Sequence, residues 1–115
     1  MFDSLKNIGQ LTQLMGKAQK LQDAMKKMQE SLSMQRMSAD AGDGRVTATV
    51  NGRMELLDLR IDRERMDATN VNLLQDLIVA AVQGAQAKAA EVVKQEMQRL
   101  SADVGLPPEM LPQLS

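Results

Sequence analysis

The chain has 115 residues, which is enough for one domain with a modest hydrophobic core. It contains no cysteine, which excludes a disulfide framework, a thiolate nucleophile and a cysteine-based metal site. Fourteen basic and fifteen acidic residues give a net charge of −1, which excludes nucleic-acid binding by bulk positive charge.

A heptad pattern predicts a first long helix over residues 4–32. At roughly 1.5 Å per residue this helix is on the order of 40 Å long, far longer than a small domain requires. It must lie against another helix, either the second helix of the same chain or a helix of a partner subunit, and the pattern leaves that choice open. Its apolar residues at alternating steps of three and four, here called the heptad seam, are Leu11, Leu14, Ala18, Leu21, Met25, Met28 and Leu32.

Residues 34–62 predict a three-stranded antiparallel sheet. Residues 34–40 are interpreted as an edge strand, and Gly42-Asp43-Gly44 as a turn whose glycines can take positive φ. Residues 45–50 alternate polar and apolar side chains with β-branched members, which is typical of a half-buried strand.

The third strand is predicted as the return of a hairpin. Asn51-Gly52 is a strong hairpin signal and favours a two-residue type I′ turn. A two-residue loop would place Val46 opposite Leu57. Within the returning strand, over residues 53–62, one face would carry Leu57, Leu59 and Ile61.

A second long amphipathic helix is predicted over residues 71–103, with Asp67, Thr69 or Asn70 as its N-cap. Gly105 and the prolines that follow it end this helix. We therefore expect an α+β fold, in which two long helices flank an antiparallel sheet, as a single domain over residues 1–105. Residues 106–115 are expected to form a flexible, proline-rich tail.

An active site is not expected. The acidic residues Asp58, Asp62, Glu64 and Asp67 resemble a hard-metal site in type, but arginines alternate with them, which favours a solvated strand edge with local ion pairs. A glycine-rich phosphate loop followed by a helix and a lysine is also missing from the sequence. We predict no enzyme, no metal, no small-molecule substrate and no cofactor.

The net charge hides a local excess of lysine in the first helix. Residues 1–27 contain five lysines and two aspartates, a balance of +3. A row of lysines on the outer face could follow a phosphate backbone, although such a row is also the ordinary solvated face of an amphipathic helix. The basic residues of the second helix are weaker candidates for phosphate contacts, because acidic residues outnumber basic residues there. The lysines of the first helix are Lys6, Lys17, Lys20, Lys26 and Lys27.

Several stretches of the chain resemble the YbaB/EbfC family of bacterial nucleoid-associated proteins. The resemblance rests on the lysine- and glutamine-rich first helix, the Val-Asn-Gly hairpin and the Asp-Leu-Ile-Val-Ala-Ala opening of the second helix, and it covers nearly the whole chain. The stretches concerned are residues 14–22, 28–30, 46–53, 59–62, 74–82 and 105–107.

The resemblance implies a tweezer-like homodimer with projecting helical arms. It also implies binding to double-stranded DNA with little sequence preference, and a role in nucleoid organisation or gene expression. By position, the implied DNA-binding residues are Lys17, Lys20, Lys26 and Lys27 on the first helix and Lys88, Lys94 and Arg99 on the second.

Two alternatives use the same helix differently. The methionine-rich helices could clamp a client or adaptor helix in a protein-interaction module. The first turns could also lie on a membrane surface through Phe2, Leu5 and Ile8 beside Lys6. The resemblance implies a nucleoid location, and the lack of cysteine favours the cytoplasm. No membrane association is expected, because the longest apolar stretch, residues 77–82, is too short to span a bilayer.

Overall fold

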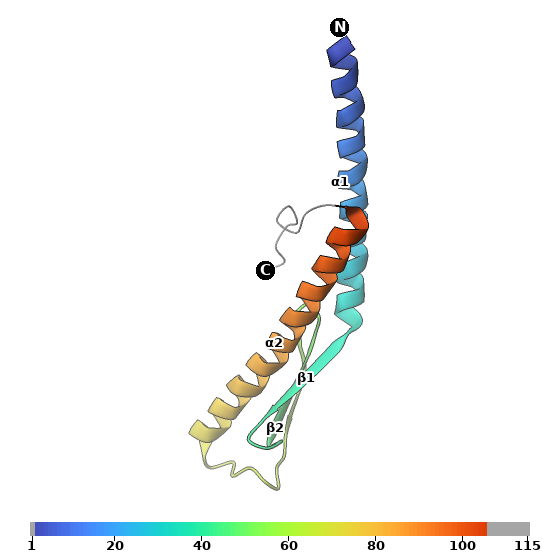
Figure 1. The fold of residues 1–115 in the computed structure, drawn as a ribbon. Helices are drawn as coiled ribbons and strands as arrows, with labels where there is room; N and C mark the ends of the chain where they lie inside the picture. Colours follow the sequence, from blue (N-terminus) through green and yellow to red (C-terminus); the bar gives the residue numbers. More distant parts are fainter. Residues whose placement is uncertain (1, 106–115) are drawn as a thin grey trace.

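Two long helices flank a small antiparallel sheet in an elongated molecule (Figure 1). The computed structural model describes the backbone of residues 2–105 and the side chains of residues 8–105, so the expected tail lies outside the described residues. The molecule measures 79 × 21 × 18 Å. The predicted α+β order is confirmed, with α1 at Phe2–Met34, β1 at Arg36–Ala41, β2 at Val46–Asn51, β3 at Leu56–Ile61 and α2 at Val71–Val104.

The main core lies between α2 and the first two strands. The sheet order is β1-β2-β3, and α2 packs across β1 and β2. Small side chains on α2 let the helix approach the sheet closely, as at Gly84, where an added Cβ would lie 3.1 Å from Ala39 Cβ. This core consists of Val46, Ala48 and Val50 from β2 and Ala81, Ala85 and Ala89 from α2.

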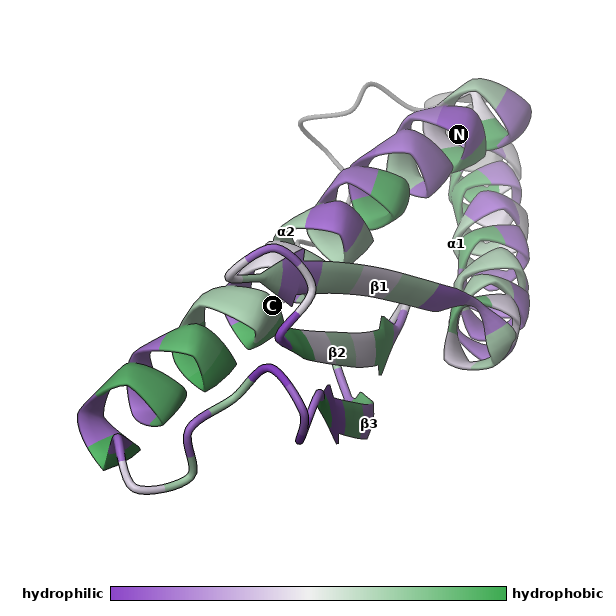
Figure 2. Cartoon of the chain, turned by 90° about the horizontal axis from the view of Figure 1, so that it is seen from below, coloured by the Kyte–Doolittle hydropathy of each residue, from purple (hydrophilic) through white to green (hydrophobic). Residues whose placement is uncertain are grey.

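The third strand lies at the edge of the sheet that α2 does not cover (Figure 2). Leu59 packs against the main core. Leu57 and Ile61, which the sequence predicts on the same face as Leu59, keep 44% and 37% of their surface exposed. The described chain therefore leaves an apolar surface open on β3.

The heptad seam divides into a packed half and an exposed half. Met28 and Leu32 are buried against Leu100 of α2, so this part of α1 packs on the second helix of the same chain. Leu11 and Leu14 are 57% and 62% exposed. The apolar heptad spacing is the same along the whole seam, but the seam packs against α2 along only part of its length.

The predicted two-residue turn at Asn51-Gly52 is wrong, although the hairpin itself is present. Residues 52–55 form a four-residue loop, and Val46 pairs with Ile61 instead of Leu57. Gly52 does not take the positive φ of a type I′ turn; Met54 does, at 65°. The loop is held by other contacts: the Gly52 N–H donates to the carbonyl oxygen of Leu32 at 2.8 Å, and the Asn51 side chain accepts from the backbone amides of Arg53 and Glu55. Glycine is required at position 52 because an added Cβ would lie 2.7 Å from that carbonyl oxygen.

Local signals at the other element ends are confirmed. Gly42, Asp43 and Gly44 all have positive φ in the turn between β1 and β2. Asn70, one of the three N-cap candidates, accepts a hydrogen bond from the Leu73 backbone amide at 3.2 Å. Gly105 ends α2 in the left-handed region at a φ of 74°.

Candidate nucleic-acid interface

The first helix extends well beyond the end of α2 (Figure 1). Every residue from 8 to 20 is exposed, and we call this stretch the α1 arm. Its leucine, lysine, glutamine, methionine and alanine residues have high helix propensity. Glycine at positions 9 and 16 opposes helix formation, and no atom lies within 4 Å of where a Cβ would stand at either position. The arm therefore offers its whole circumference to another molecule.

Four of the predicted DNA-binding lysines lie on α1. Lys17 and Lys20 belong to the arm, and Lys26 and Lys27 follow where α1 begins to pack on α2. All four are exposed, and within the described residues none of them forms an ion pair. Their ammonium groups are therefore available to an external anion.

Acidic side chains interrupt the lysine row toward the sheet. Asp23 and Glu30 stand three or four residues from Lys26 and Lys27, which places them on neighbouring positions of the helix surface. Lys17 has no acidic residue at these spacings. The positive potential is therefore expected to be strongest on the arm and weaker near the sheet.

Amide side chains extend the donor surface of the arm. Gln10, Gln13, Leu14 and Lys17 line a shallow hollow on one side of α1. Glutamine amides and lysine ammonium groups are both donors to phosphate oxygens. A surface formed by one exposed helix suits contact with an extended polyanion better than enclosure of a small substrate.

The predicted cations of α2 differ from those of α1. Lys88 donates a hydrogen bond from Nζ to the carbonyl oxygen of Ser38 at 2.7 Å, which ties α2 to β1. Arg99 forms an ion pair with Glu96 at 3.7 Å. Lys94 is exposed and forms no ion pair among the described residues. Lys88 and Arg99 thus both have intramolecular contacts: that of Arg99 is with a neighbour on the same helix surface, and that of Lys88 is with a residue distant in the sequence.

The acidic residues after β2 have local partners. Asp58 forms an ion pair with Arg60 at 3.0 Å, and Asp62 with Arg65 at 4.0 Å. The Thr69 hydroxyl and backbone amide donate to the Asp67 carboxylate at 2.6 and 2.9 Å, and these bonds lower the pKa of Asp67 below its ordinary value of 3.8. Among the described residues, no three His, Cys, Asp or Glu side chains are grouped so that they could hold a metal ion.

A profile of the YbaB/EbfC DNA-binding family matches residues 7–104. The chain belongs to this family. The resemblance seen in the sequence is confirmed, and the YbaB/EbfC family is defined by DNA binding, not by a catalysed reaction. Among the described residues, none of the helices is both long enough and apolar enough to span a bilayer.

Relatives of this YbaB/EbfC chain carry the name nucleoid-associated protein. One from Syntrophobacter fumaroxidans is 42% identical over 94 residues, covering 82% of this chain and 86% of the relative. Another, from Pelotomaculum thermopropionicum, is 37% identical over 99 residues, covering 86% and 94%. Neither the family nor these relatives support the alternative of a module that clamps a client helix.

A solved structure shares the fold of this YbaB/EbfC chain. The crystal structure of the uncharacterized protein HP0035 from Helicobacter pylori aligns with a TM-score of 0.67 and 23% sequence identity. The alignment covers 73% of this chain and 88% of the other. At that identity the likeness establishes the arrangement of helices and sheet.

Proposed function

We propose that this YbaB/EbfC chain binds double-stranded DNA with little sequence preference through the lysines of α1. The observation that supports this most strongly is that the described lysines of α1 form no ion pairs, whereas several arginines elsewhere in the described chain do. All four ion pairs among the described residues use arginine, whereas Lys17, Lys20, Lys26 and Lys27 form none. Four cations without an ion pair therefore lie along one helix, which projects from the body, whereas the other cations without an ion pair in the described residues are spread over β1, the turns beside the strands, and α2.

The physical basis of this binding is the release of condensed counterions from DNA. Each lysine that neutralises a phosphate displaces counterions, so local positive charge can bind DNA even though the chain carries a net charge of −1. Lysine contacts a phosphate as a point charge and carries no information about the base. We therefore expect similar affinity for unrelated duplexes and a role in nucleoid organisation or gene expression, in the cytoplasm.

We further propose that the chain acts as a homodimer that buries the open face of β3. Leu57 and Ile61 remain exposed because α2 covers only β1 and β2. Apolar side chains on an edge strand favour association with another polypeptide. Two copies joined through their sheets would each present one projecting α1 arm to DNA.

The DNA proposal is tested by fluorescence anisotropy with several duplexes of unrelated sequence. Reversing two charges with Lys20→Glu and Lys27→Glu should weaken binding to every duplex alike, by about tenfold or more at moderate salt. The control carries the same change in net charge away from the α1 arm, on β3 and just after it, through Arg60→Glu and Arg63→Glu. Equal losses in both variants, or no loss in the first, would contradict a site on α1.

The dimer proposal is tested separately by sedimentation equilibrium. The chain has a mass of 12.6 kDa, and we expect the wild type to sediment at twice that value. Leu57→Glu should shift the equilibrium toward the monomer, whereas Arg60→Gln on the same strand should not. A wild type that remains monomeric would remove this part of the proposal and leave the DNA test intact.

A further inference from the structure

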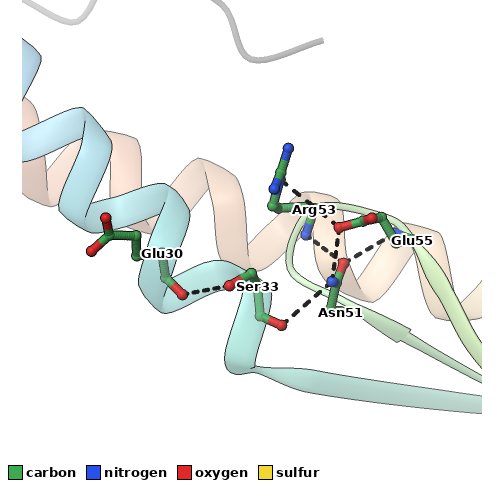
Figure 3. A network of polar contacts seen from close by, with 5 residues as sticks. All are labelled: Glu30, Ser33, Asn51, Arg53 and Glu55. Atoms are coloured by element: carbon green, nitrogen blue, oxygen red, sulfur yellow. Dashed lines mark hydrogen bonds and ion pairs between the residues drawn. The ribbon is translucent and has the colours of Figure 1, made fainter.

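Asn51 holds the junction between α1 and the sheet (Figure 3). Its side-chain oxygen accepts hydrogen bonds from the backbone amides of Arg53 and Glu55, at 2.9 and 3.0 Å. Its Nδ2 donates to the Glu55 carboxylate at 3.1 Å and to the Ser33 carbonyl at 3.4 Å. With 4% of its surface exposed, Asn51 is one of two buried polar residues in the described chain. One side chain thus connects the end of α1 to the loop after β2.

The residue that follows Asn51 makes this position chemically vulnerable. Asparagine is a thermolabile residue, and its side chain can be attacked by the backbone nitrogen of the next residue. The Gly52 nitrogen loses its proton and forms a bond to Asn51 Cγ, the Cγ–Nδ2 bond breaks, and ammonia leaves. Water then opens the resulting succinimide to aspartate or isoaspartate. Glycine adds no side chain to hinder the ring closure.

The folded structure opposes each requirement of this reaction. The Gly52 N–H donates to the Leu32 carbonyl at 2.8 Å, which hinders loss of its proton. The four hydrogen bonds of the Asn51 side chain hold its Cγ in place, and burial keeps water and hydroxide away. Two of these hydrogen bonds depend on the docking of α1, because the acceptors Leu32 and Ser33 belong to that helix, whereas the bonds to Arg53 and Glu55 lie within the loop.

We propose that Asn51-Gly52 is a deamidation site that becomes reactive when the α1–sheet junction opens. The products cannot restore the junction. Aspartate at position 51 would replace the Nδ2 donor with a carboxylate oxygen facing two acceptors, on Ser33 and Glu55. Isoaspartate would lengthen the backbone by one carbon where Gly52 contacts Leu32. Each opening therefore risks permanent loss of the contacts between the end of α1 and the loop after β2, whether or not α1 binds DNA.

The test follows deamidation of the full-length protein in mildly alkaline buffer. Trypsin cleaves after Arg45 and Arg53, so mass spectrometry of the peptide Val46–Arg53 reports on Asn51. We expect the chain unfolded in guanidinium chloride to deamidate at least about tenfold faster than the native protein, because the native reaction requires opening. Asn70 and Asn72, which precede larger residues, serve as slow internal references.

Two further measurements tie the rate to the junction. Leu32→Ala should accelerate native deamidation by about tenfold or more, whereas Met34→Ala, at an exposed position of the same helix, should not. In the wild type, denaturant below the unfolding transition should raise the rate in proportion to junction opening, which keeps the test valid if Leu32→Ala does not fold. Equal rates in native and unfolded protein would overturn the proposal.

Discussion

The backbone amide of Gly52 lies 2.8 Å from the carbonyl oxygen of Leu32, and this hydrogen bond joins the last turns of α1 to the loop after β2. Helix ends leave carbonyl groups without partners inside the helix, and here the loop supplies one. An added Cβ at Gly52 would come 2.7 Å from the same oxygen. The absence of a side chain at position 52 thus sets how closely the C-terminal end of α1 approaches the sheet.

Gly52→Ala should destabilise the fold. The backbone around Leu32 would have to move to admit the methyl group, at a cost of about 1–3 kcal/mol in the free energy of unfolding. Denaturant unfolding followed by circular dichroism measures this change. Gly16→Ala is the control, since no atom lies within 4 Å of its Cβ position, and it should stabilise the protein by about 0.5–1 kcal/mol. A neutral Gly52→Ala would contradict the close contact.

Leu32→Ala should remove the principal attachment of α1 to α2. Leu32 is 2% exposed and packs against Leu100, so truncation should cost about 2–5 kcal/mol. Met34→Ala, at a position that is 83% exposed, should change stability by less than about 0.5 kcal/mol. Thermal unfolding at a fixed protein concentration compares them, because association of chains would make the midpoint concentration-dependent. Similar midpoints for the two variants would show that the packed half of the heptad seam does not hold α1.

The pKa of Asp67 should depend on Thr69. The folded-state pKa lies below the ordinary 3.8, so this interaction stabilises the fold above that pH and is lost as the pH falls through the folded pKa. Thr69→Ala removes the hydroxyl donor and should raise the pKa of Asp67, while the residue 69 backbone amide keeps it below the ordinary value. Titration of the Asp67 carboxyl carbon by NMR measures the shift. An unchanged pKa would exclude the hydroxyl as its main cause.

Lys88→Ala should affect stability more than DNA binding. The Nζ of Lys88 donates to the Ser38 carbonyl, and loss of that bond should cost about 1 kcal/mol. Lys94→Ala on the same helix removes an exposed cation without an ion pair among the described residues and should be nearly neutral for stability. Denaturant unfolding and DNA titration of both variants distinguish the roles. A larger loss of DNA affinity than of stability at Lys88 would place it in the interface instead.

Local sequence patterns predicted the helices and strands of this fold, but not the tertiary contacts that each helix and loop makes. The Asn-Gly pair correctly indicated a hairpin, yet its loop is not a type I′ turn and is held by the hydrogen bonds of Asn51 and Gly52. The heptad seam looks uniform from Leu11 to Leu32, and only the position of α2 shows where intramolecular packing stops.

At the candidate site, too, the sequence predicted which residue types are present but not which of them make tertiary contacts. The excess of lysine in the first helix is a property of sequence and helical periodicity. The engagement of Lys88 with Ser38 joins residues fifty positions apart, so spacing along the chain carried no signal for it. The DNA-binding role of the α1 lysines stays a prediction that binding measurements must test.

The central claim, that lysines of α1 bind DNA by neutralising phosphates, is tested most directly by the salt dependence of affinity. The slope of log affinity against log salt falls by about 0.9 for each phosphate contact that is lost. Replacing Lys20 and Lys27 by glutamine should therefore reduce the slope measured with the wild type by about 1.8 if each contacts one phosphate. A slope equal to that of the wild type would show that these two lysines do not contact the DNA backbone.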